Sequence, residues 1–411
     1  MGGLIPDSFI EELLGRVDIV EVIERRVPLK KAGREYQARC PFHDEKTPSF
    51  TVSPQKQFYH CFGCGAHGSV IGFMMNYEGL EFVDAVEELA RMAGLQVPRD
   101  TATSAPRPAA GLYDLLQQAG AWYQAQLKQN PQAIEYLKRR GLSGEVAARF
   151  EVGYAPAGWD GLIKQLGVDD SRLKLLHRAG MLSEGKSGAY DKFRDRIMFP
   201  IHDRRGRIIA FGGRALADDG PKYLNSPETE LFHKGRELYG LYMARKSQAK
   251  LGQILVVEGY MDVVALAQFG FNNCVATLGT ATTGDHAELL FRAADEVVYC
   301  FDGDRAGRKA AWRALEATLP RLREGRQARF LFLPEGEDPD SLVRGQGRAA
   351  FESMLASAQP LSEYFFDHFT QAVDMSSIDG RARLVGLAKP YLEQIPQGVF
   401  RDMMFSRLEA L

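Results

Sequence analysis

Four short runs of apolar residues stand close together in the second half of the chain. Glycine or polar residues bound each run, and the segments between the runs repeat their apolar positions with the period of a helix. Short apolar runs separated by helical segments are typical of parallel strands covered on both faces. The pattern therefore predicts a parallel α/β sheet built on residues 254–257, 274–278, 297–301 and 329–333.

Acidic residues follow three of these four predicted strands. Because the carboxyl ends of parallel strands meet at one edge of a sheet, we expect up to seven carboxylates there. They are Glu258, Asp262, Asp302, Asp304, Glu337, Asp338 and Asp340. Neighbouring carboxylates repel one another unless divalent cations neutralise their negative charge. Carboxylate oxygens are suitable ligands for Mg²⁺ or Mn²⁺. The alternative is helix capping, for instance by Asp302 or Asp304 for a helix beginning near Arg305.

The strongest spacing signal lies near the N-terminus. Residues 40–43 and 61–64 each place two metal-binding side chains at a two-residue spacing. Two such pairs surround one tetrahedral zinc ion in zinc ribbons, and residues 49–60 between them have the pattern of a β-hairpin. His60 and His67 lie nearby and are alternatives for the third and fourth ligands. The sequence thus predicts one structural zinc, held by Cys40, His43, Cys61 and Cys64.

Other patterns divide the chain into domains. Residues 194–214 alternate basic and apolar positions and predict a hairpin that turns near Arg205-Gly206, and residues 360–411 are helical in pattern. We expect a multidomain protein of mixed α+β and α/β class. Its predicted parts are a zinc-binding domain (1–98), a flexible linker (99–110), a basic α+β subdomain (111–250), the parallel metal-binding subdomain (251–350) and a helical subdomain (351–411).

Charge and cysteine content narrow the class of protein. The net charge is -2, so nucleic acid would have to bind through local basic surface, and residues 186–250 supply it with 14 Lys and Arg against 8 Asp and Glu. No apolar run is long enough to span a membrane, and the N-terminus has no signal-peptide pattern. Cys274 and Cys300 stand alone in apolar strands. These features predict a protein of the reducing cytoplasm.

Two motifs resemble those of a known family. Val257-Glu-Gly-Tyr-Met-Asp262 and, further on, Phe301-Asp-Gly-Asp-Arg-Ala-Gly307 resemble the Toprim domain shared by primases and topoisomerases. The form Glu-Gly-Tyr-Met-Asp is similar to bacterial DnaG-type primases in particular. The pattern Cys-Pro-Phe-His followed by Cys-Phe-Gly-Cys is similar to the zinc-binding domain of the same family. The resemblance extends over essentially the whole chain.

The resemblance implies a DNA primase, which condenses nucleoside triphosphates into a short RNA primer on a single-stranded DNA template within the primosome. Together with the acidic pattern, it points to two Mg²⁺ or Mn²⁺ ions. Their expected ligands are Glu258, Asp302 and Asp304, with Asp338, Asp340 and Asp262. The segments Phe-Gly-Gly-Arg and Lys-Tyr-Leu-Asn-Ser-Pro-Glu-Thr are similar to basic segments of the family. They imply nucleotide or template contacts for Arg214, Lys222, Asn225 and Lys234.

The template is expected to bind by charge and by base stacking. Candidate aromatic residues of the ribbon are Phe50, Phe58 and Tyr59. Strand alternation allows only some of them to face outward, and the others are expected to form a small core.

Two other classes of protein share parts of these motifs. A Toprim topoisomerase needs a tyrosine in a separate cleavage domain and a gate for DNA, and this chain has no room for them. A non-enzymatic recombination clamp combines zinc with a Toprim-like fold, but it is usually shorter and without intact metal acids. DnaG-type primases usually continue into a C-terminal helicase-binding domain. We expect this domain and helicase docking to be absent here, and the chain to be a fragment or a shortened form.

Overall fold

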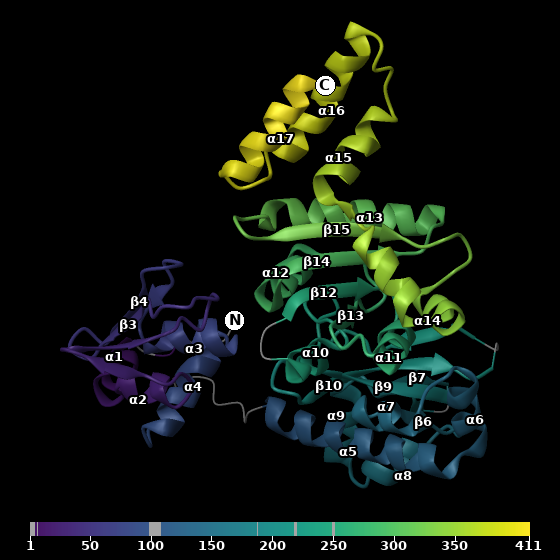
Figure 1. The fold of residues 1–411 in the computed structure, drawn as a ribbon. Coiled ribbons are helices and arrows are strands. Elements are labelled where there is room, and N and C mark those ends of the chain that lie inside the picture. The colour runs from purple at the N-terminus through teal and green to yellow at the C-terminus, as the bar shows by residue number, and fades with distance from the viewer. Residues whose placement is uncertain (1–4, 6, 98–107, 187, 218–219, 249–250) are drawn as a thin grey trace. The chain divides into compact units, whose positions relative to one another are not determined.

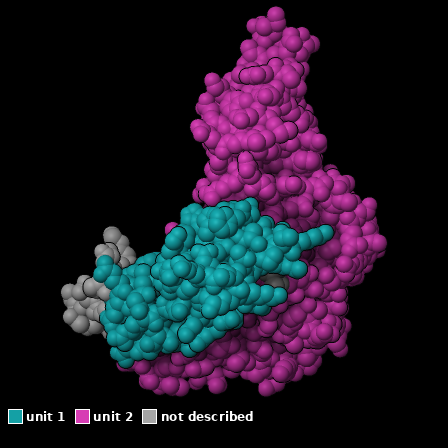
Figure 2. Space-filling model, turned by 60° about the vertical axis from the view of Figure 1, so that its left-hand side comes forward, with its two compact units in different colours: residues 1–106 teal, residues 107–411 magenta. Residues whose placement is uncertain are grey.

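The computed structural model describes the chain except for residues 1–4, 6, 98–107, 187, 218–219 and 249–250. The described chain divides into two compact units, residues 1–106 and 107–411 (Figure 2). Most of the predicted linker lies outside the described residues, and its last three residues begin helix α5.

Unit 1 is an antiparallel sheet with strand order β1-β2-β3-β4-β5, packed against helices (Figure 1). The predicted hairpin is β3 and β4, in which Val52 lies opposite Tyr59. Ser69 caps the helix that follows the sheet by accepting a hydrogen bond from the Gly72 N–H. The elements are α1 (Asp7–Arg16), α2 (Ile19–Glu24), β1 (Lys30–Ala32), β2 (Glu35–Ala38), β3 (Phe50–Ser53), β4 (Phe58–Cys61), β5 (His67–Gly68), α3 (Val70–Glu78) and α4 (Phe82–Met92).

The first part of unit 2 joins helices to an antiparallel sheet with strand order β11-β10-β9-β6. The predicted hairpin is β9 and β10, and its turn contains Gly206 at a φ of 79°, which favours glycine. The elements are α5 (Pro108–Gln129), α6 (Pro131–Arg139), α7 (Gly144–Arg149), β6 (Gly153–Ala155), α8 (Gly161–Leu166), α9 (Asp170–Arg178), β7 (Leu182–Gly185), β8 (Gly188–Asp191), β9 (Arg196–His202), β10 (Ile208–Ala215), β11 (Tyr223–Asn225) and α10 (Leu241–Ser247).

The predicted parallel sheet is confirmed. Its strand order is β13-β12-β14-β15-β16, in which the first four strands are parallel and β16 joins the edge antiparallel. The elements are β12 (Leu251–Val257), α11 (Tyr260–Gln268), β13 (Cys274–Ala276), α12 (Gly284–Ala293), β14 (Ala294–Phe301), α13 (Arg305–Thr318), the 3-10 helix η2 (Leu319–Arg321), β15 (Gln327–Phe332), α14 (Pro339–Ala356) and β16 (Gln359–Pro360).

Both faces of the parallel sheet are buried, as its continuous apolar strands predicted. Leu255 and Val257 belong to the core that α11 and α14 share with the first part of unit 2. Ile254 and Val256 point to the other face and pack with α12 and α13. The same second core extends to three C-terminal helices, α15 (Leu361–Thr370), α16 (Ile378–Leu392) and α17 (Val399–Ala410). The sheet is therefore fixed from both sides, and its strand ends are rigidly placed.

Candidate functional site

Four side chains of unit 1 form a compact group of metal-binding atoms. The ligand atoms of Cys40, His43, Cys61 and Cys64 all lie within 4.8 Å of one another. The Cys40 and Cys64 sulfurs are 3.7 Å apart, and the Cys61 sulfur is 3.7 Å from His43 Nδ1. In a tetrahedron with zinc–sulfur bonds of about 2.3 Å, two sulfurs are about 3.8 Å apart. The group therefore fits one zinc ion.

The surroundings of this group hold its ligands in place. Glu45 accepts hydrogen bonds from the N–H groups of Cys40 at 2.6 Å and Ser49 at 3.0 Å, and it lies 3.5 Å from His43 Nε2. Ser49 Oγ is 3.1 Å from the Cys61 sulfur. A Cβ atom at Gly63 would lie 2.6 Å from the His43 ring, so only glycine fits at that position. Such outer contacts orient metal ligands.

His60 and His67, the alternative ligands, are not part of this group. His67 Nδ1 lies 2.8 Å from the Gly65 carbonyl oxygen instead.

The predicted alternation of the aromatic residues along the ribbon strands is found. Phe50 and Tyr59 are buried, whereas Phe58 is 38% exposed. Phe62, which the sequence analysis did not single out, is 75% exposed. The outward-facing aromatic residues of the ribbon are therefore Phe58 and Phe62.

In unit 2, carboxylates gather at the carboxyl ends of β12, β14 and β15. Burial and then the charges of Asp338 and Asp304 raise the pKa of Asp302. Burial and then the charge of Asp302 raise the pKa of Glu258, whose carboxylate also accepts a hydrogen bond from the Asp302 N–H. These mutual shifts show that the acids lie within range of one another's charge. We call Glu258, Asp302, Asp304 and Asp338 the acidic rim.

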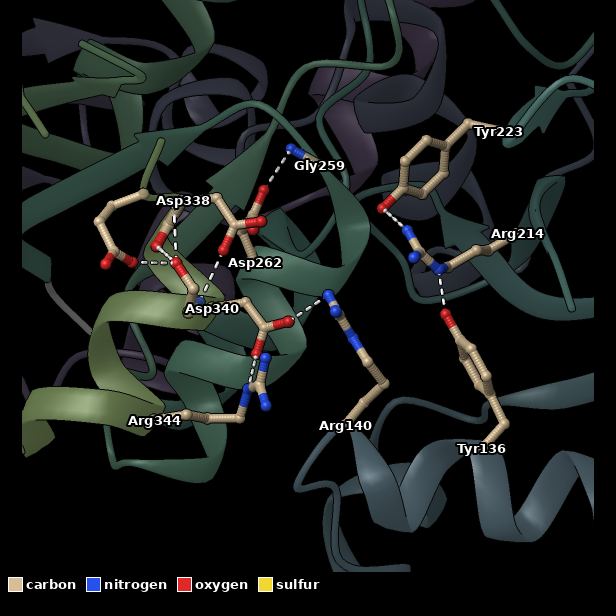
Figure 3. Close-up of polar contacts among 11 residues, drawn as sticks. Tyr136, Arg140, Arg214, Tyr223, Gly259, Asp262, Asp338, Asp340 and Arg344 are labelled. Atoms are coloured by element: carbon tan, nitrogen blue, oxygen red, sulfur yellow. Dashed lines mark hydrogen bonds and ion pairs between the residues drawn. The ribbon is translucent and has the colours of Figure 1, made fainter. Parts of the chain in front are cut away.

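Asp262 lies beside the acidic rim, in the first turn of α11. Burial and then the charges of Asp338 and Asp340 raise its pKa to about 8. Its Oδ2 accepts a hydrogen bond from the Gly259 N–H at 3.0 Å (Figure 3). Burial and like charges both disfavour the ionised form of this carboxyl group.

Two rim acids also cap helices, as the alternative interpretation proposed. Asp304 Oδ1 accepts from the Gly307 N–H at 2.7 Å, and Asp338 Oδ1 accepts from the Ser341 N–H at 2.6 Å. Each cap occupies one oxygen and leaves the second oxygen of the carboxylate for another ligand. Within the described residues, the rim is not as tight as the Cys/His group, which is the only set of three or more ligand atoms found within 4.8 Å.

Asp340 has a different environment from the other acids. Its side chain is fully buried and forms ion pairs with Arg140 and with Arg344, whose Nε lies 2.6 Å from Asp340 Oδ1 (Figure 3). Both oxygens thus face arginines. This geometry favours a structural role over the predicted role as a metal ligand.

Gly303 sets the position of the two aspartates beside it. A Cβ atom there would collide with the Leu333 carbonyl at the end of β15. The turn between Asp302 and Asp304 therefore packs directly against the next strand, and only glycine allows this approach.

Arg214 and Lys222 lie on one basic surface. The Arg214 guanidinium donates hydrogen bonds to the hydroxyls of Tyr136 and Tyr223, and its Cζ is 5.1 Å from the Tyr223 ring centre (Figure 3). Lys222 Nζ is 5.9 Å from the same ring centre. The charge of Asp262 contributes to the raised pKa of Tyr223, although burial is the larger cause. This basic surface therefore lies close to the acids.

Asn225 and Lys234 are held by backbone contacts. Asn225 Nδ2 donates to the Leu278 carbonyl at 2.8 Å, while its buried Oδ1 has no hydrogen-bond partner among the described residues. The Lys234 N–H donates to Glu228 at 3.1 Å, and its carbonyl oxygen lies 2.9 Å from His286 Nε2. Asn225 lies in β11, the strand that pairs with the strand of Arg214 and directly follows Lys222. Within the described chain no hydrogen bond joins Lys234 to Arg214 or Lys222, so the structure links Lys234 less closely to this set.

Comparison with known proteins decides the family. Residues 5–105 match the CHC2 zinc finger, residues 122–245 the N-terminal domain of the DNA primase catalytic core, and residues 255–343 a Toprim-like domain. The DNA primase of Escherichia coli strain K12 is 55% identical over 98% of this chain and 70% of its own length. The chain belongs to the DnaG-type DNA primase family.

Solved structures of DnaG primases agree with this fold. A DnaG primase catalytic domain bound to single-stranded DNA is 53% identical, with a TM-score of 0.71 over 73% of this chain and 95% of that one. The zinc-binding and RNA polymerase domains of the Aquifex aeolicus primase are 36% identical, with a TM-score of 0.63 over 98% of this chain and 96% of that one. The DNA primase of Pseudomonas putida strain KT2440 is 57% identical, and the chain spans 64% of its length.

One expectation about this DnaG-type chain was wrong. Residues 362–411 match the DnaB-helicase binding domain of primase, so the segment expected to be absent is detected. These residues lie in α15, α16 and α17, whose helical patterns the sequence analysis described without assigning them a partner. Helical periodicity reports burial of one face and does not show which partner a helix binds.

Sequence reasoning also missed three residues next to the predicted ones. Tyr136 and Tyr223 hold the Arg214 guanidinium, and Arg140 pairs with Asp340. Tyr223 was visible beside Lys222, and Arg140 ends the basic run Lys-Arg-Arg. Tyr136 and Arg140 lie far from their partners in the sequence, and Tyr223 is nine residues from Arg214, so no short motif identified the pairs. Among the described residues, no helix is both long and apolar enough to cross a membrane.

Proposed function

We propose that this chain synthesises short RNA primers on single-stranded DNA from nucleoside triphosphates, by nucleotidyl transfer with two divalent metal ions. The acidic rim at the ends of β12, β14 and β15 carries this proposal. The raised pKa values of Glu258 and Asp302 come from burial together with neighbouring carboxylates. Binding of divalent cations would relieve that repulsion, and carboxylate oxygens suit Mg²⁺ or Mn²⁺.

In this proposal, Glu258, Asp302, Asp304 and Asp338 hold the two ions. When bound, Mg²⁺ or Mn²⁺ makes a 3′-hydroxyl more acidic and stabilises charge on the attacked phosphate and the leaving pyrophosphate. The caps at Asp304 and Asp338 fix one oxygen of each carboxylate and so orient the other. Gly303 keeps Asp302 and Asp304 against the end of β15. The protein thus contributes preorganised charge and needs no side-chain nucleophile.

Phosphates of the nucleotide or template would bind on the basic surface. Arg214 is held in place by two tyrosine hydroxyls, so little side-chain freedom is lost when it binds an anion. Lys222 beside it is exposed and adds a second positive charge. Asn225 and Lys234 remain proposed contacts. Asn225 Oδ1, which has no hydrogen-bond partner among the described residues, can accept a hydrogen bond from a ligand.

The remaining partners follow from the family. The ribbon would hold one structural zinc and present Phe58 and Phe62 to template bases. The DnaB-helicase binding match over residues 362–411 supports docking of this segment on a replicative helicase in the primosome. We also propose a cytoplasmic location, because the cysteine content of the sequence suits a reducing compartment.

The experiment that tests the proposal supplies labelled nucleoside triphosphates, single-stranded DNA and Mg²⁺, and measures dinucleotide formation. Product should appear only when template and divalent cation are both present. A recombination clamp would bind DNA and make no product, and a topoisomerase would relax supercoiled DNA instead. Binding without any synthesis at saturating Mg²⁺ and Mn²⁺ would overturn the proposal.

A further inference from the structure

A groove with a volume of about 650 Å³ runs between α13 and α15 and is lined by other residues than the basic surface already described. Four cations of α13 line it, and the last three follow Arg305 by three, four and eight residues, which places them on one side of the helix. Aromatic residues from α13 and α15 also line it. We call it the α13/α15 groove and define it by Arg305, Arg308, Lys309, Trp312, Arg313 and His368.

The cations of the groove are free to bind an anion. Arg305, Arg308, Lys309 and Arg313 are exposed, and in the described part of the chain none has a carboxylate within ion-pair distance. Two acids also line the groove, so its four cations exceed its acids by two, and each acid is hydrogen-bonded to another lining residue. Glu316 accepts a hydrogen bond from Trp312 Nε1 at 3.0 Å, and Asp367 accepts one from Gln359. The groove thus keeps a positive surface along one helix.

Aromatic rings accompany these cations. The exposed His368 ring stacks on Trp312 with ring centres 3.8 Å apart and an interplanar angle of 19°. Arg308 lies 5.0 Å above the ring centre of Phe332. A positive groove that also offers flat aromatic rings is typical of surfaces that bind single-stranded nucleic acid, because phosphates meet the cations and bases stack on the rings.

The position of the groove ties it to the acidic rim. Helix α13 begins directly after Asp304, so the row of cations starts where the rim ends. From Arg305 to Arg313 the row extends about 12 Å at a helical rise of about 1.5 Å per residue. A single phosphate would contact only part of this row, whereas a strand with several phosphates matches its length.

We propose that the α13/α15 groove binds single-stranded template DNA next to the acidic rim. Newly made primer is paired with its template, so its bases are not free to stack on the rings of the groove. This inference rests on the proposed function, because the strand is one on which the rim acts. An acidic protein segment would pair with the same cations, but its carboxylate side chains have no flat ring to stack on Trp312 and His368. The groove also includes residues of α15 that match the helicase-binding domain, so helicase docking is the competing outcome.

The first test changes the charges. In the whole chain, Lys309→Ala with Arg313→Ala is compared with Arg383→Ala with Lys389→Ala, which removes one arginine and one lysine from exposed positions of α16. Affinity for short DNA and RNA homopolymers is measured against salt concentration. The groove variant should lower the slope of log affinity on log salt by about 1.4, because each phosphate contact to a single strand adds about 0.7. The control should leave the slope unchanged.

The second test changes the stacking ring. His368→Ala should weaken binding roughly tenfold without changing the salt slope, since stacking involves no counterion release. His368→Phe should restore the affinity because it restores a flat ring. Oligonucleotides carrying a photoreactive base should cross-link to residues 305–313 or 359–371. DNA affinity should weaken in the groove variants, and weakening of RNA affinity alone would overturn the assignment to the template.

These binding tests do not depend on synthesis, so they can fail separately from the proposed function. If the chain makes primers but the groove variants bind both polymers as the control does, the groove proposal is wrong and the proposed function stands. If the groove variants lose helicase binding and keep nucleic-acid affinity, the groove is a docking site for the helicase and the proposal is wrong. If the groove variants weaken binding while the wild type makes no primer, only the proposed function fails.

Discussion

Arg140 and Asp340 connect two parts of unit 2 that lie far apart in the sequence. Arg140 directly follows α6 in the first part of the unit, and Asp340 lies in the first turn of α14, the helix that follows β15. Their ion pair buries the Asp340 carboxylate, which also binds Arg344. Because Asp338 lies at the start of the same helix, this contact fixes one end of the acidic rim.

Removing Arg140 should therefore destabilise unit 2. Arg140→Met would leave the buried Asp340 charge with one partner instead of two, and breaking a buried pair costs about 3 to 5 kcal/mol. With Arg344 still present, we expect the lower end of that range in urea unfolding. Arg139→Met, at an exposed neighbouring position, is the control and should have little effect. If Asp340→Asn left stability unchanged but abolished Mg²⁺ binding, Asp340 would be a metal ligand after all.

Zinc should be essential for the fold of unit 1. Four ligands close the coordination sphere, and structural zinc contributes about 10 to 16 kcal/mol of apparent folding free energy in zinc-finger peptides. Metal analysis should find one zinc per chain, and Cys61→Ser should lose it. Cys274→Ser, a cysteine outside the group, should keep it. Full zinc content in Cys61→Ser, or a cooperative unfolding transition of unit 1 that chelators do not affect, would contradict this assignment.

The aromatic residues of the ribbon should separate stability from binding. Phe50 is fully buried, so Phe50→Ala should destabilise unit 1 by about 3 to 5 kcal/mol. Phe62 is 75% exposed, so Phe62→Ala should leave unfolding unchanged and weaken binding to single-stranded DNA. Circular dichroism melts and fluorescence anisotropy measure the two effects. Equal DNA affinity of Phe62→Ala and wild type would exclude template stacking at this position.

Asp262 should make metal-free protein less stable as pH rises. Its pKa is raised to about 8 in the folded chain from an ordinary value of 3.8, so the folded state holds a proton that the unfolded state has lost. Stability should therefore fall between about pH 4 and pH 8 and level off above that range. Asp262→Asn should show a shallower fall, and Mg²⁺ should stabilise wild type most at high pH. Parallel pH profiles for the two proteins would argue against the shift.

The fold was largely predictable because its signals are local. The apolar runs ending at Val257 and Phe301 and the two-residue spacings around Cys40 and Cys61 are properties of short segments, and the sheet and ribbon follow them. The acidic strand ends followed from parallel topology. The environments of these acids did not follow, because they depend on distant contacts such as Arg140 with Asp340. The cap at Asp304 was among the sequence interpretations, whereas the cap at Asp338 became visible only with the backbone in place.

The most direct test of the account is dinucleotide synthesis by Asp304→Asn and Asp302→Asn at saturating Mg²⁺, with DNA affinity and thermal stability measured alongside. Asparagine caps helices as well as aspartate does, so Asp304→Asn preserves the start of α13 and removes only the charge. We predict that synthesis falls by about 10² to 10³ or more in each variant while DNA binding and stability persist. Near-full synthesis in both variants would show that these acids only cap helices and would contradict the proposed metal site.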